Sequence, residues 1–566
     1  MGFDSAVETI AWERVHLTIV TKLTQTQADT EPAVPPDEVT YRLQSLRFGY
    51  PVQTEYLGDG RHRLTLTITD FHDRRPIPDG AWRLIAEHGG EDLSAVRLPL
   101  DRVDAMDDYS RVFLYSQNTE SYSVTFGITE SDVRPEFVIR TYRFYRNPVV
   151  ADLSSAKRLA GTAARRLKVA ASDPRPVGLA IRSLSRMFRR VFGSPGNRIL
   201  FASEMRGKLE GNLLRVRDRM LERGLDEQFE FTYSFRLPSS SSTLGTLGLI
   251  RKLATADIIL VDDYFGLLEN LYLDPKVKVI QLWHAGSGFK SIGYSRFGKY
   301  GSPKLFNAHR RYTYAIAGST HLVPVYAEAF GIEERAVVPT GLPRIDTFLD
   351  PELSRAAVDA FYAAHPELVG KRIILFAPTF RGRGILDAYY DYDQIDFARW
   401  WEQCGDDTVV LFRMHHFVAE PPPIPEQYRD RLIDAAGFGD TNDLLRVADV
   451  LITDYSSVIY EYSLLRRPML FFSYDREVYA ATRGFHRDFE ETAPGKACDT
   501  FDELLTAIAE SDFETWRIDA FVEENFDYVD TGSTDRVIDW LILGEPPQPA
   551  GPDAGRQPAA DQEGQA

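Results

Sequence analysis

The amino-acid sequence predicts an α/β protein in which two Rossmann-like lobes follow a β-sandwich-like N-terminal domain. Three observations support this prediction. A chain of 566 residues exceeds what one hydrophobic core usually organises. Apolar and polar side chains alternate in several runs within residues 1–150. From residue 197 onward, short apolar runs alternate with helix-like segments, as in βα units around parallel sheets.

Residues 1–150 are expected to form the β-rich domain because their apolar residues recur with the period of a half-buried strand. Leu64, Leu66 and Ile68 alternate with threonines, and residues 122–128 repeat the pattern. Turn-rich stretches such as 58–60 and 76–80 separate these runs. No catalytic motif stands out in the domain, so we expect a structural or acceptor-positioning role.

Residues 151–196 form a basic segment in a chain whose formal net charge is −18. Eleven Lys or Arg residues lie between Ala151 and Arg198, against two acidic residues, Asp152 and Asp173. The later half has apolar residues at helical spacing with arginines between them, which predicts a basic amphipathic helix. Such a helix can lie on an anionic membrane surface or dock between domains, and the charge favours the membrane. The acidity of the whole chain argues against nucleic-acid binding.

The two lobes are assigned to residues 197–348 and 349–543. Apolar strands are expected at 198–202, 257–261, 277–282, 314–317, 372–376, 408–412, 449–452 and 469–472. No G-x-G-x-x-G fingerprint accompanies them, so a nicotinamide or flavin dinucleotide is not expected. Residues 544–566 are rich in Pro, Gly, Ala and Gln and are predicted to be disordered.

Polar residues that directly follow an apolar strand are candidate site residues, because ligands of open α/β sheets bind beyond the carboxyl ends of the strands. His284 follows the run at 277–282 and precedes a glycine-containing loop that ends at Lys290. An imidazole suits a general base near neutral pH. Arg344 can bind a phosphate through its planar guanidinium group. The plainer alternatives are a buried strand-end histidine and a surface ion pair.

Three further groups follow strands of the second lobe. The first is Pro378 with Thr379, and the second is Arg413 with His415. Strand alternation places Arg413 and His415 on one side of the chain and His416 on the other, which favours His415 and disfavours zinc binding by the adjacent histidines. In the third group, Ser456 and Ser457 can start a helix that binds an anion, and Glu461 can accept hydrogen bonds from a ribose. Simple helix capping is the alternative. No metal or cofactor is predicted.

In this order, the five groups resemble the CDP-glycerol glycerophosphotransferase family, which comprises teichoic-acid primases and polymerases. The resemblance covers about residues 197–540. It depends on Trp-His-Ala and Phe-Lys at 283–290, Thr-Gly-Leu-Pro-Arg at 340–344, Ala-Pro-Thr-Phe-Arg at 377–381, Arg-Met-His at 413–415 and Thr-Asp-Tyr-Ser-Ser at 453–457. Many members have His-Gly-Thr-Pro where His284 is here followed by Ala-Gly-Ser-Gly, a difference that bears on the acceptor.

The resemblance implies a GT-B-like fold, with the acceptor on the first lobe and a CDP-glycerol or related CDP-alditol donor on the second. It also implies a lipid-linked polymer acceptor and a peripheral location at the cytoplasmic face of the membrane. The sequence shows no secretory signal or membrane span, in keeping with that location. By position, His284 and His415 correspond to essential histidines. The residues implied to contact the donor are Arg344, Pro378, Thr379, Arg413, Ser456, Ser457 and Glu461.

The implied reaction is in-line transfer of glycerol phosphate, or a related alditol phosphate, to a polymer hydroxyl. His284 accepts the hydroxyl proton and CMP leaves. Two other functions are consistent with the sequence. A GT-B glycosyltransferase that uses a nucleotide sugar predicts release of UDP or GDP in place of CMP. A non-catalytic cell-wall assembly protein predicts that function survives replacement of both His284 and His415.

Overall fold

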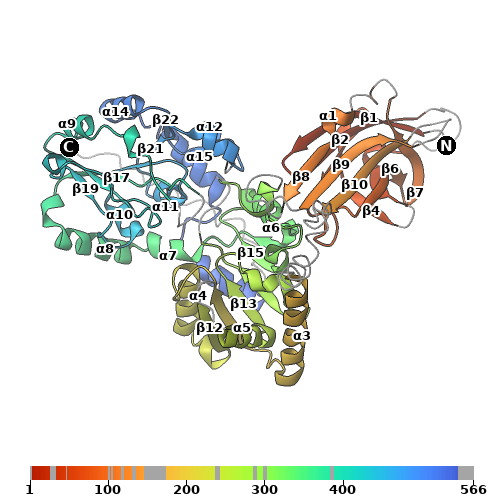
Figure 1. Ribbon diagram of the computed structural model, residues 1–566, viewed down its shortest axis with the longest axis horizontal. Coiled ribbons are helices and arrows are strands. Elements are labelled where there is room, and N and C mark those ends of the chain that lie inside the picture. Colours follow the sequence, from red (N-terminus) through yellow and green to blue (C-terminus); the bar gives the residue numbers. More distant parts are fainter. Residues whose placement is uncertain are drawn as a thin grey trace, which may run out of the picture.

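The structure is a computed structural model, and Figure 1 shows a β-rich domain and two α/β lobes that meet near helix α6 (Val323–Phe330). It describes residues 3–25, 34–45, 48–99, 102, 106–115, 120–129, 136–145, 174–235, 243–284, 290–297, 303–382, 388–482 and 484–545. Three predicted features lie partly or wholly outside these residues: the first half of the basic segment, the loop after His284 and the C-terminal tail.

Within the described residues of the N-terminal domain there are ten strands, and seven of them close into a ring. The order is β3-β4-β5-β2-β1-β7-β6, and β3 also pairs with β6, which joins the two ends of the row. Strands β10, β9 and β8 extend the sheet from β6. The bounds are β1 (Phe3–Glu13), β2 (His16–Gln25), β3 (Thr40–Gln44), β4 (Gly49–Gly58), β5 (Arg61–Thr67), β6 (Gly80–His88), β7 (Glu91–Arg97), β8 (Arg111–Tyr115), β9 (Glu120–Ile128) and β10 (Phe137–Tyr145).

The predicted β-structure is confirmed, but the predicted β-sandwich-like arrangement is not. Leu64 and Leu66 are fully buried, as the period-two pattern requires. The pairing of Leu43 in β3 with Leu84 in β6 closes the strands into a barrel-like ring, whereas a sandwich keeps two separate sheets.

The β-rich domain is anchored to the first lobe by aromatic packing and by arginine side chains. Phe297 belongs to the chain of the first lobe, yet its ring lies 5.4 Å from those of Phe113 and Tyr115 inside the β-domain core. In return, Arg74 of the β-domain donates to the carbonyl of Arg310 at 3.0 Å. The segment that follows the His284 loop is therefore held between two domains.

The first lobe contains a six-stranded parallel sheet in the order β12-β11-β13-β14-β15-β16. Its central strands are buried on both faces, which explains their continuous apolar sequences. The bounds are β11 (Arg198–Ser203), α4 (Gly211–Glu222), β12 (Glu230–Phe235), α5 (Thr243–Thr255), β13 (Ile258–Val261), β14 (Lys278–Gln281), β15 (Tyr314–Ile316), β16 (Val337–Val338) and α7 (Pro343–Leu349).

The second lobe contains another six-stranded parallel sheet, in the order β19-β18-β17-β20-β21-β22. The strand bounds are β17 (Arg372–Phe376), β18 (Thr408–Phe412), β19 (Leu432–Asp434), β20 (Val450–Thr453), β21 (Met469–Phe472) and β22 (Lys496–Cys498). The helices are α8 (Pro351–Ala364), α9 (Phe397–Cys404), α10 (Thr441–Val447), α11 (Val458–Ser463), α12 (Arg476–Thr482), α13 (Phe489–Thr492), α14 (Phe501–Glu510) and α15 (Trp516–Asn525). The eight strands predicted for the two lobes are all present, and the paired Rossmann-like arrangement is confirmed.

The end of the described chain returns to the first lobe, although the sequence prediction placed it in the second. Helix α16 (Ser533–Arg536) continues into a π-helix at Val537–Leu543. Arg219 in α4 forms an ion pair of 2.9 Å with Asp535, and Lys278 in β14 donates to the carbonyl of Leu541 at 2.9 Å. The lobes are therefore connected by two chain crossings, at α7 and before α16.

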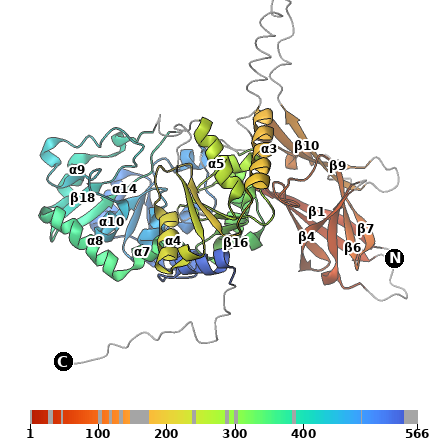
Figure 2. The ribbon, with the colours of Figure 1, turned by 90° about the horizontal axis from the view of Figure 1, so that it is seen from below.

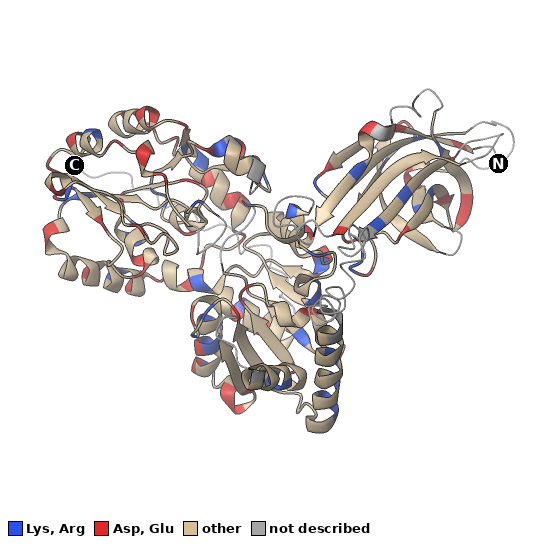
Figure 3. Cartoon of the chain, in the orientation of Figure 1, with Lys and Arg blue, Asp and Glu red and all other residues tan. Residues whose placement is uncertain are grey.

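Helix α3 (Pro174–Phe192) forms where the basic amphipathic helix was expected, and it packs beside α5 (Figure 2). Ile181, Leu184 and Phe188 pack against the core of the first lobe. Leu179 and Val191 are 66% and 67% exposed, and Figure 3 shows basic residues along the helix. One face therefore docks on the lobe and another faces outward. In the part of the chain that is described, no helix combines the length and the apolar character needed to cross a bilayer.

Candidate active site

His284 lies beyond the carboxyl end of β14 and is oriented by the neighbouring strand. Its Nδ1 atom lies 3.2 Å from Oδ2 of Asp263, which follows β13, the strand that pairs with β14. Burial acts to raise the pKa of Asp263, but the hydrogen bond and charge of His284 hold that pKa below its ordinary value. With Nδ1–H directed at Asp263, the Nε2 atom is the proton acceptor. The sequence prediction gave Asp263 no role, although its place directly after an adjacent strand was the signal that identifies it.

A buried asparagine fixes the backbone around His284. Trp283 has a φ of 48°, in the left-handed region that bulky residues rarely adopt. The side-chain amide of Asn212 donates to the carbonyls of Leu282 and Trp283 at 2.9 and 2.8 Å, and its oxygen accepts from the backbone N–H of Arg344 at 2.9 Å. Asn212 therefore positions two of the predicted site residues, although the sequence predicted no role for it.

Arg344 and Glu461 pair with each other across the two lobes. Arg344, at the start of α7, donates from Nη2 to Glu461 in α11 and from Nη1 to the carbonyl of His284 at 2.6 Å. The side chain of Glu461 is 2% exposed. Burial, with the nearby charge of Arg206, lowers the pKa of Arg344 to about 10, so its guanidinium group stays charged at neutral pH. The structure therefore brings together His284, Arg344 and Glu461, with Arg344 in contact with both of the other two residues.

The carboxyl ends of β17, β18 and β20 border a cavity of about 380 Å³. Four of the predicted residues line it: Pro378, Arg413, His415 and Ser456. Nδ1 of His415 accepts a hydrogen bond from the backbone N–H of Phe417 at 3.2 Å, which leaves the ring proton on Nε2. Burial, then the charges of His416 and Lys290, lower the pKa of His415 to about 4. His415 is therefore a neutral hydrogen-bond donor at neutral pH.

Arg413 uses its guanidinium group to hold one wall of this cavity. Its Nη1 atom donates to the carbonyls of Ala435 and Ala436 at 2.9 and 2.7 Å, and Nη2 donates to the carbonyl of Gly439 at 2.7 Å. Its Nε atom donates to the hydroxyl of Thr441 at 3.3 Å. The role that the structure gives to Arg413 is to support the turn at 435–439, rather than to present a free cation to a phosphate.

Thr379 belongs to a buried network beside the same strand ends. Its backbone N–H and hydroxyl donate to Oδ1 of Asp454 at 2.8 and 2.7 Å. Arg381 also donates to Asp454, at 2.8 Å, and forms an ion pair of 2.5 Å with Asp475. The charge of Asp454 is thus compensated inside the second lobe, and Thr379 is buried with it.

Ser456 and Ser457 precede α11, which has six residues. Ser457 makes no capping hydrogen bond with its side chain, and the hydroxyl of Ser456 accepts from the N–H of Val458 at 3.5 Å, a long contact. Both side chains are half-buried. Simple capping therefore does not account for the two serines, and Ser456 faces the 380 Å³ cavity.

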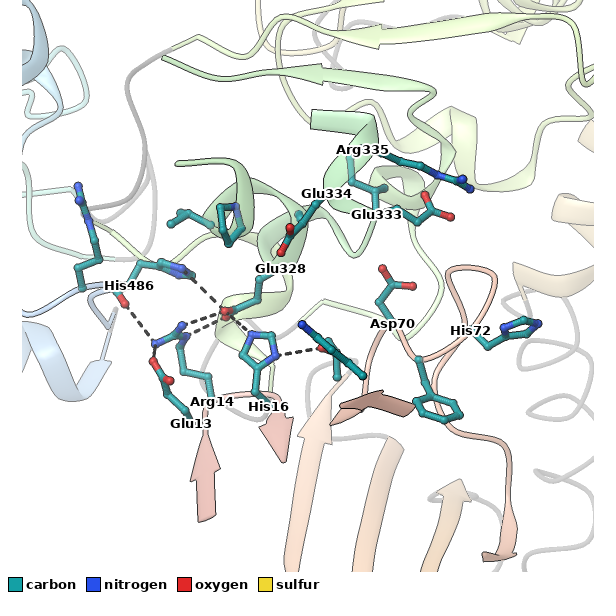
Figure 4. A pocket seen from close by; sticks show the side chains of 18 of the residues that line it. Glu13, Arg14, His16, Asp70, His72, Glu328, Glu333, Glu334, Arg335 and His486 are labelled. Atoms are coloured by element: carbon teal, nitrogen blue, oxygen red, sulfur yellow. Dashed lines mark hydrogen bonds and ion pairs between the residues drawn. The ribbon is translucent and has the colours of Figure 1, made fainter. Parts of the chain in front are cut away.

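A larger cavity, of about 990 Å³, lies where the β-domain meets both lobes (Figure 4). Glu328 of α6 stands on its wall and accepts hydrogen bonds from Arg14 and His16 of the β-domain. His486 of the second lobe lies 3.8 Å from the same carboxylate. None of the predicted site residues lines this cavity, and its acidic residues outnumber its arginines. An excess of negative charge disfavours binding of a nucleoside diphosphate, so we do not assign the donor to this cavity. Its lining residues come from the β-domain and both lobes, which makes it a domain junction.

Comparison with known proteins bears on residues in both lobes. A family model described as "CDP-Glycerol:Poly(glycerophosphate) glycerophosphotransferase" matches residues 183–543. The chain is 37% identical to a teichoic acid poly(ribitol-phosphate) polymerase of Bacillus spizizenii, over 64% of this chain and 58% of the relative. It is 38% identical to the teichoic acid ribitol-phosphate polymerase TarL of Staphylococcus aureus, over 61% of this chain and 62% of the relative. The chain thus spans about three fifths of the length of these curated relatives.

A solved structure, of the wall teichoic acid polymerase TagF, has the same fold. The two superpose with a TM-score of 0.52 at 20% sequence identity, and the match covers 69% of this chain and 98% of that one. At this identity the likeness concerns the fold alone.

Proposed function

Because the chain belongs to the CDP-glycerol:poly(glycerophosphate) glycerophosphotransferase family, we propose that it transfers an alditol phosphate from a CDP-activated donor to a hydroxyl of a teichoic-acid-like polymer. The products are the polymer extended by one unit and CMP. The acceptor binds on the side of the first lobe and the donor on the side of the second.

The observation that carries this proposal is the pair formed by His284 and Asp263. The carboxylate fixes Nδ1 as the protonated nitrogen, at 3.2 Å, so that Nε2 can take the proton of an attacking hydroxyl. An imidazole oriented by a carboxylate is a recurrent arrangement for activating a hydroxyl nucleophile. The same pair has no role in a non-catalytic assembly protein.

The donor side of the proposal rests on the cavity of about 380 Å³ in the second lobe. That volume lies within the range of small-molecule sites. Its walls combine the Arg413-supported turn, the Nε2–H group of His415 and the hydroxyl of Ser456. We assign the cytidine and its phosphate to this cavity, with the diphosphate directed toward the cleft between the lobes.

In the proposed reaction, the acceptor oxygen attacks the phosphorus that bears the alditol. The new P–O bond forms as the bond from that phosphorus to the CMP oxygen breaks, and the hydroxyl proton passes to Nε2 of His284. The leaving CMP carries the charge of the broken bond. Such a transfer depends mainly on alignment and on compensation of charge. A neutral His415 contributes by donating a hydrogen bond to a phosphate oxygen.

We propose ribitol phosphate as the transferred unit. The relatives at 37% and 38% identity are both named for ribitol phosphate. Glycerol phosphate is the alternative, and the donor assay below distinguishes the two.

The acceptor is proposed to be a lipid-linked polymer, which requires the protein to work at the cytoplasmic membrane face. The support is the outward side of α3, where the exposed side chain of Leu179 lies on the same helix face as the exposed Arg182 and Arg190. Apolar and basic residues on one helix face suit an anionic bilayer surface. Co-sedimentation with anionic and neutral vesicles tests this: replacing Leu179 and Val191 by Ser should abolish anionic-vesicle binding without changing turnover on a soluble acceptor.

The function itself is tested by incubating the full chain with a polymer acceptor and radiolabelled CDP-ribitol, CDP-glycerol or a UDP-sugar. The proposal predicts release of CMP and growth of the polymer, fastest with CDP-ribitol. Release of UDP would favour a glycosyltransferase, and no turnover with any donor would favour the assembly protein.

A further inference from the structure

Lys290 belongs to the first lobe by sequence, but its backbone is held by the second lobe. It forms an isolated antiparallel bridge with Phe485, and the N–H of the next residue, Ser291, donates to the carbonyl of Gly484 at 3.1 Å. These contacts use backbone atoms, so the position of Lys290 across the cleft does not depend on its side chain.

The side chain of Lys290 points toward the strand ends of the second lobe. Its Nζ atom lies 3.5 Å from Oγ1 of Thr379 and 5.8 Å from the ring centre of Tyr479. Its charge is also one of the causes of the low pKa of His415, after burial and the charge of His416. Among the described residues, no carboxylate lies within ion-pair distance of Lys290. The ammonium group is thus an uncompensated positive charge in the cleft.

The other basic groups predicted to bind the diphosphate are already committed. Arg344 pairs with Glu461 and the carbonyl of His284. Arg413 donates to three backbone carbonyls. His415 is uncharged at neutral pH because its pKa is about 4. A diphosphate needs positive charge at the reacting phosphorus, and charge-assisted hydrogen bonds are the strong ones.

We propose that Lys290 is the cation that binds the diphosphate of the donor, reaching it from the opposite lobe. The inference rests on the proposed function for the identity of the nucleotide, but its chemistry requires only a nucleoside diphosphate in the 380 Å³ cavity. Because the backbone of Lys290 is bridged to Phe485, the ammonium group is present before the donor arrives. The residue that follows the His284 loop therefore supplies the charge that the second lobe lacks.

The test is titration calorimetry of the full chain with CDP and, separately, with cytidine. K290M removes the charge and keeps the length, and K290R keeps the charge. K290M should bind CDP about 10- to 100-fold more weakly, the usual range for losing a hydrogen bond to a charged group, and should bind cytidine as the parent does. K290R should stay within about threefold of the parent, because its guanidinium group can still reach a phosphate. K276M is the matched control, since Lys276 is exposed before the amino end of β14, and it should change neither affinity.

Unchanged CDP affinity in K290M would overturn the proposal. So would an equal loss of cytidine and CDP affinity in K290M, because that pattern means the side chain shapes the pocket rather than binding phosphate. Thermal unfolding of each variant shows whether the fold is kept. If the parent prefers UDP to CDP, the proposed donor is wrong, and the same comparison with UDP then decides the role of Lys290.

Discussion

Two Arg–Glu pairs, each with a buried glutamate and a half-buried arginine, connect parts of this molecule, and they differ in how completely their polar atoms are satisfied. At the domain junction, Arg14 donates from Nε and Nη2 to the two oxygens of Glu328 at 2.8 and 2.9 Å, and His16 adds a bond of 2.8 Å. In the cleft, Arg344 gives one nitrogen to Glu461 and another to the carbonyl of His284, while its buried Nε has no partner among the described residues.

The difference indicates which pair is fixed and which can rearrange. A fully satisfied buried network is rigid, whereas an unsatisfied buried group in a native structure calls for an explanation. For Arg344 the explanation is its place between His284 and the donor lobe, where a change of partner can accompany substrate binding. The junction pair therefore sets the position of the β-domain, and the cleft pair responds to substrate.

The largest expected effect is loss of stability at the junction. E328Q leaves Arg14, which is half-buried, with a weakened partner, so the free energy of unfolding should fall by about 3 kcal/mol, the lower end of the cost of removing one partner of a buried ion pair. E461Q, the matched change in the cleft, should cost only about 1–2 kcal/mol because its network is incomplete. Denaturant unfolding of both variants measures the difference. Equal losses would contradict the distinction between the two pairs.

Acidification should weaken the junction by a smaller amount. Burial raises the pKa of Glu328, but the hydrogen bonds of Arg14 and His16 outweigh it and bring the pKa to about 2, below its ordinary 4.5. A carboxylate whose pKa is lowered by folding stabilises the fold above pH 4.5, and this stabilisation is lost as the pH falls toward 2. The stability gap between the wild type and E328Q should therefore narrow by about 1 kcal/mol on going from pH 7 to pH 4. If the stability difference between the wild type and E328Q stayed constant from pH 7 to pH 4, protonation of Glu328 would not be the cause of the acid destabilisation.

His486 extends the same acid response to milder pH. Burial lowers its pKa to about 4 from an ordinary 6.5, although the charge of Glu328 opposes the shift. Folding then favours the neutral ring, so stability is lost as the pH falls from 6.5 to 4. H486Q should flatten the pH dependence of thermal unfolding in that window, and an unchanged slope would exclude the histidine as the cause.

Changing Arg344 should affect turnover more than folding. R344K keeps a positive charge but cannot contact both Glu461 and the carbonyl of His284 with one planar group. We expect kcat/KM for CMP release to fall about 10- to 100-fold, the equivalent of one lost charge-assisted hydrogen bond. R14K, the matched change at the junction, should lower stability and leave the turnover of the folded enzyme within about threefold. If R344K mainly lowered stability and R14K mainly lowered turnover, the assignment of the cleft pair to substrate and of the junction pair to folding would be contradicted.

Among the predicted effects on binding and turnover, the smallest concerns the wall of the donor cavity. R413A removes the contacts to the carbonyls of the turn at 435–439, so CDP should bind about tenfold more weakly through loss of that wall. T441V removes the 3.3 Å contact to Arg413 and replaces one hydroxyl of the cavity lining by a methyl group of similar size, so it should change the affinity less than threefold by the same reasoning. Calorimetric titration with CDP measures both. If T441V costs as much as R413A, the carbonyl contacts are not what supports the turn.

The sequence predicted the strands with strong apolar runs and missed the weak ones. β16 has two residues and β19 has three, and β12 is an edge strand whose side chains stay partly exposed. The closure of the β-domain into a ring could not be predicted from the sequence either. Local alternation predicts a strand but not its distant partner, and here the closing pair, β3 with β6, is decided by long-range register.

The candidate site was predictable to the level of residue positions but not of pairing. His284 and His415 follow from the rule of polar residues at strand ends. The ion pair between Arg344 and Glu461 joins residues 117 positions apart in the chain. The hydrogen bond from Thr379 to Asp454 joins residues 75 positions apart. Contacts over such distances cannot be read from local sequence patterns. Asp263 was missed because its place after β13 points to His284 only once β13 and β14 are known to be neighbours in the sheet.

The most direct test of the account compares CMP release by the wild type, H284A and D263N, with CDP binding measured in parallel. H284A should release CMP about 10²- to 10⁴-fold more slowly, the usual contribution of a general base, and should bind CDP as the wild type does. D263N keeps the size of the side chain but not its charge, so its rate of CMP release should fall by less than that of H284A. Normal CMP release by H284A would contradict the assignment of His284 as the base.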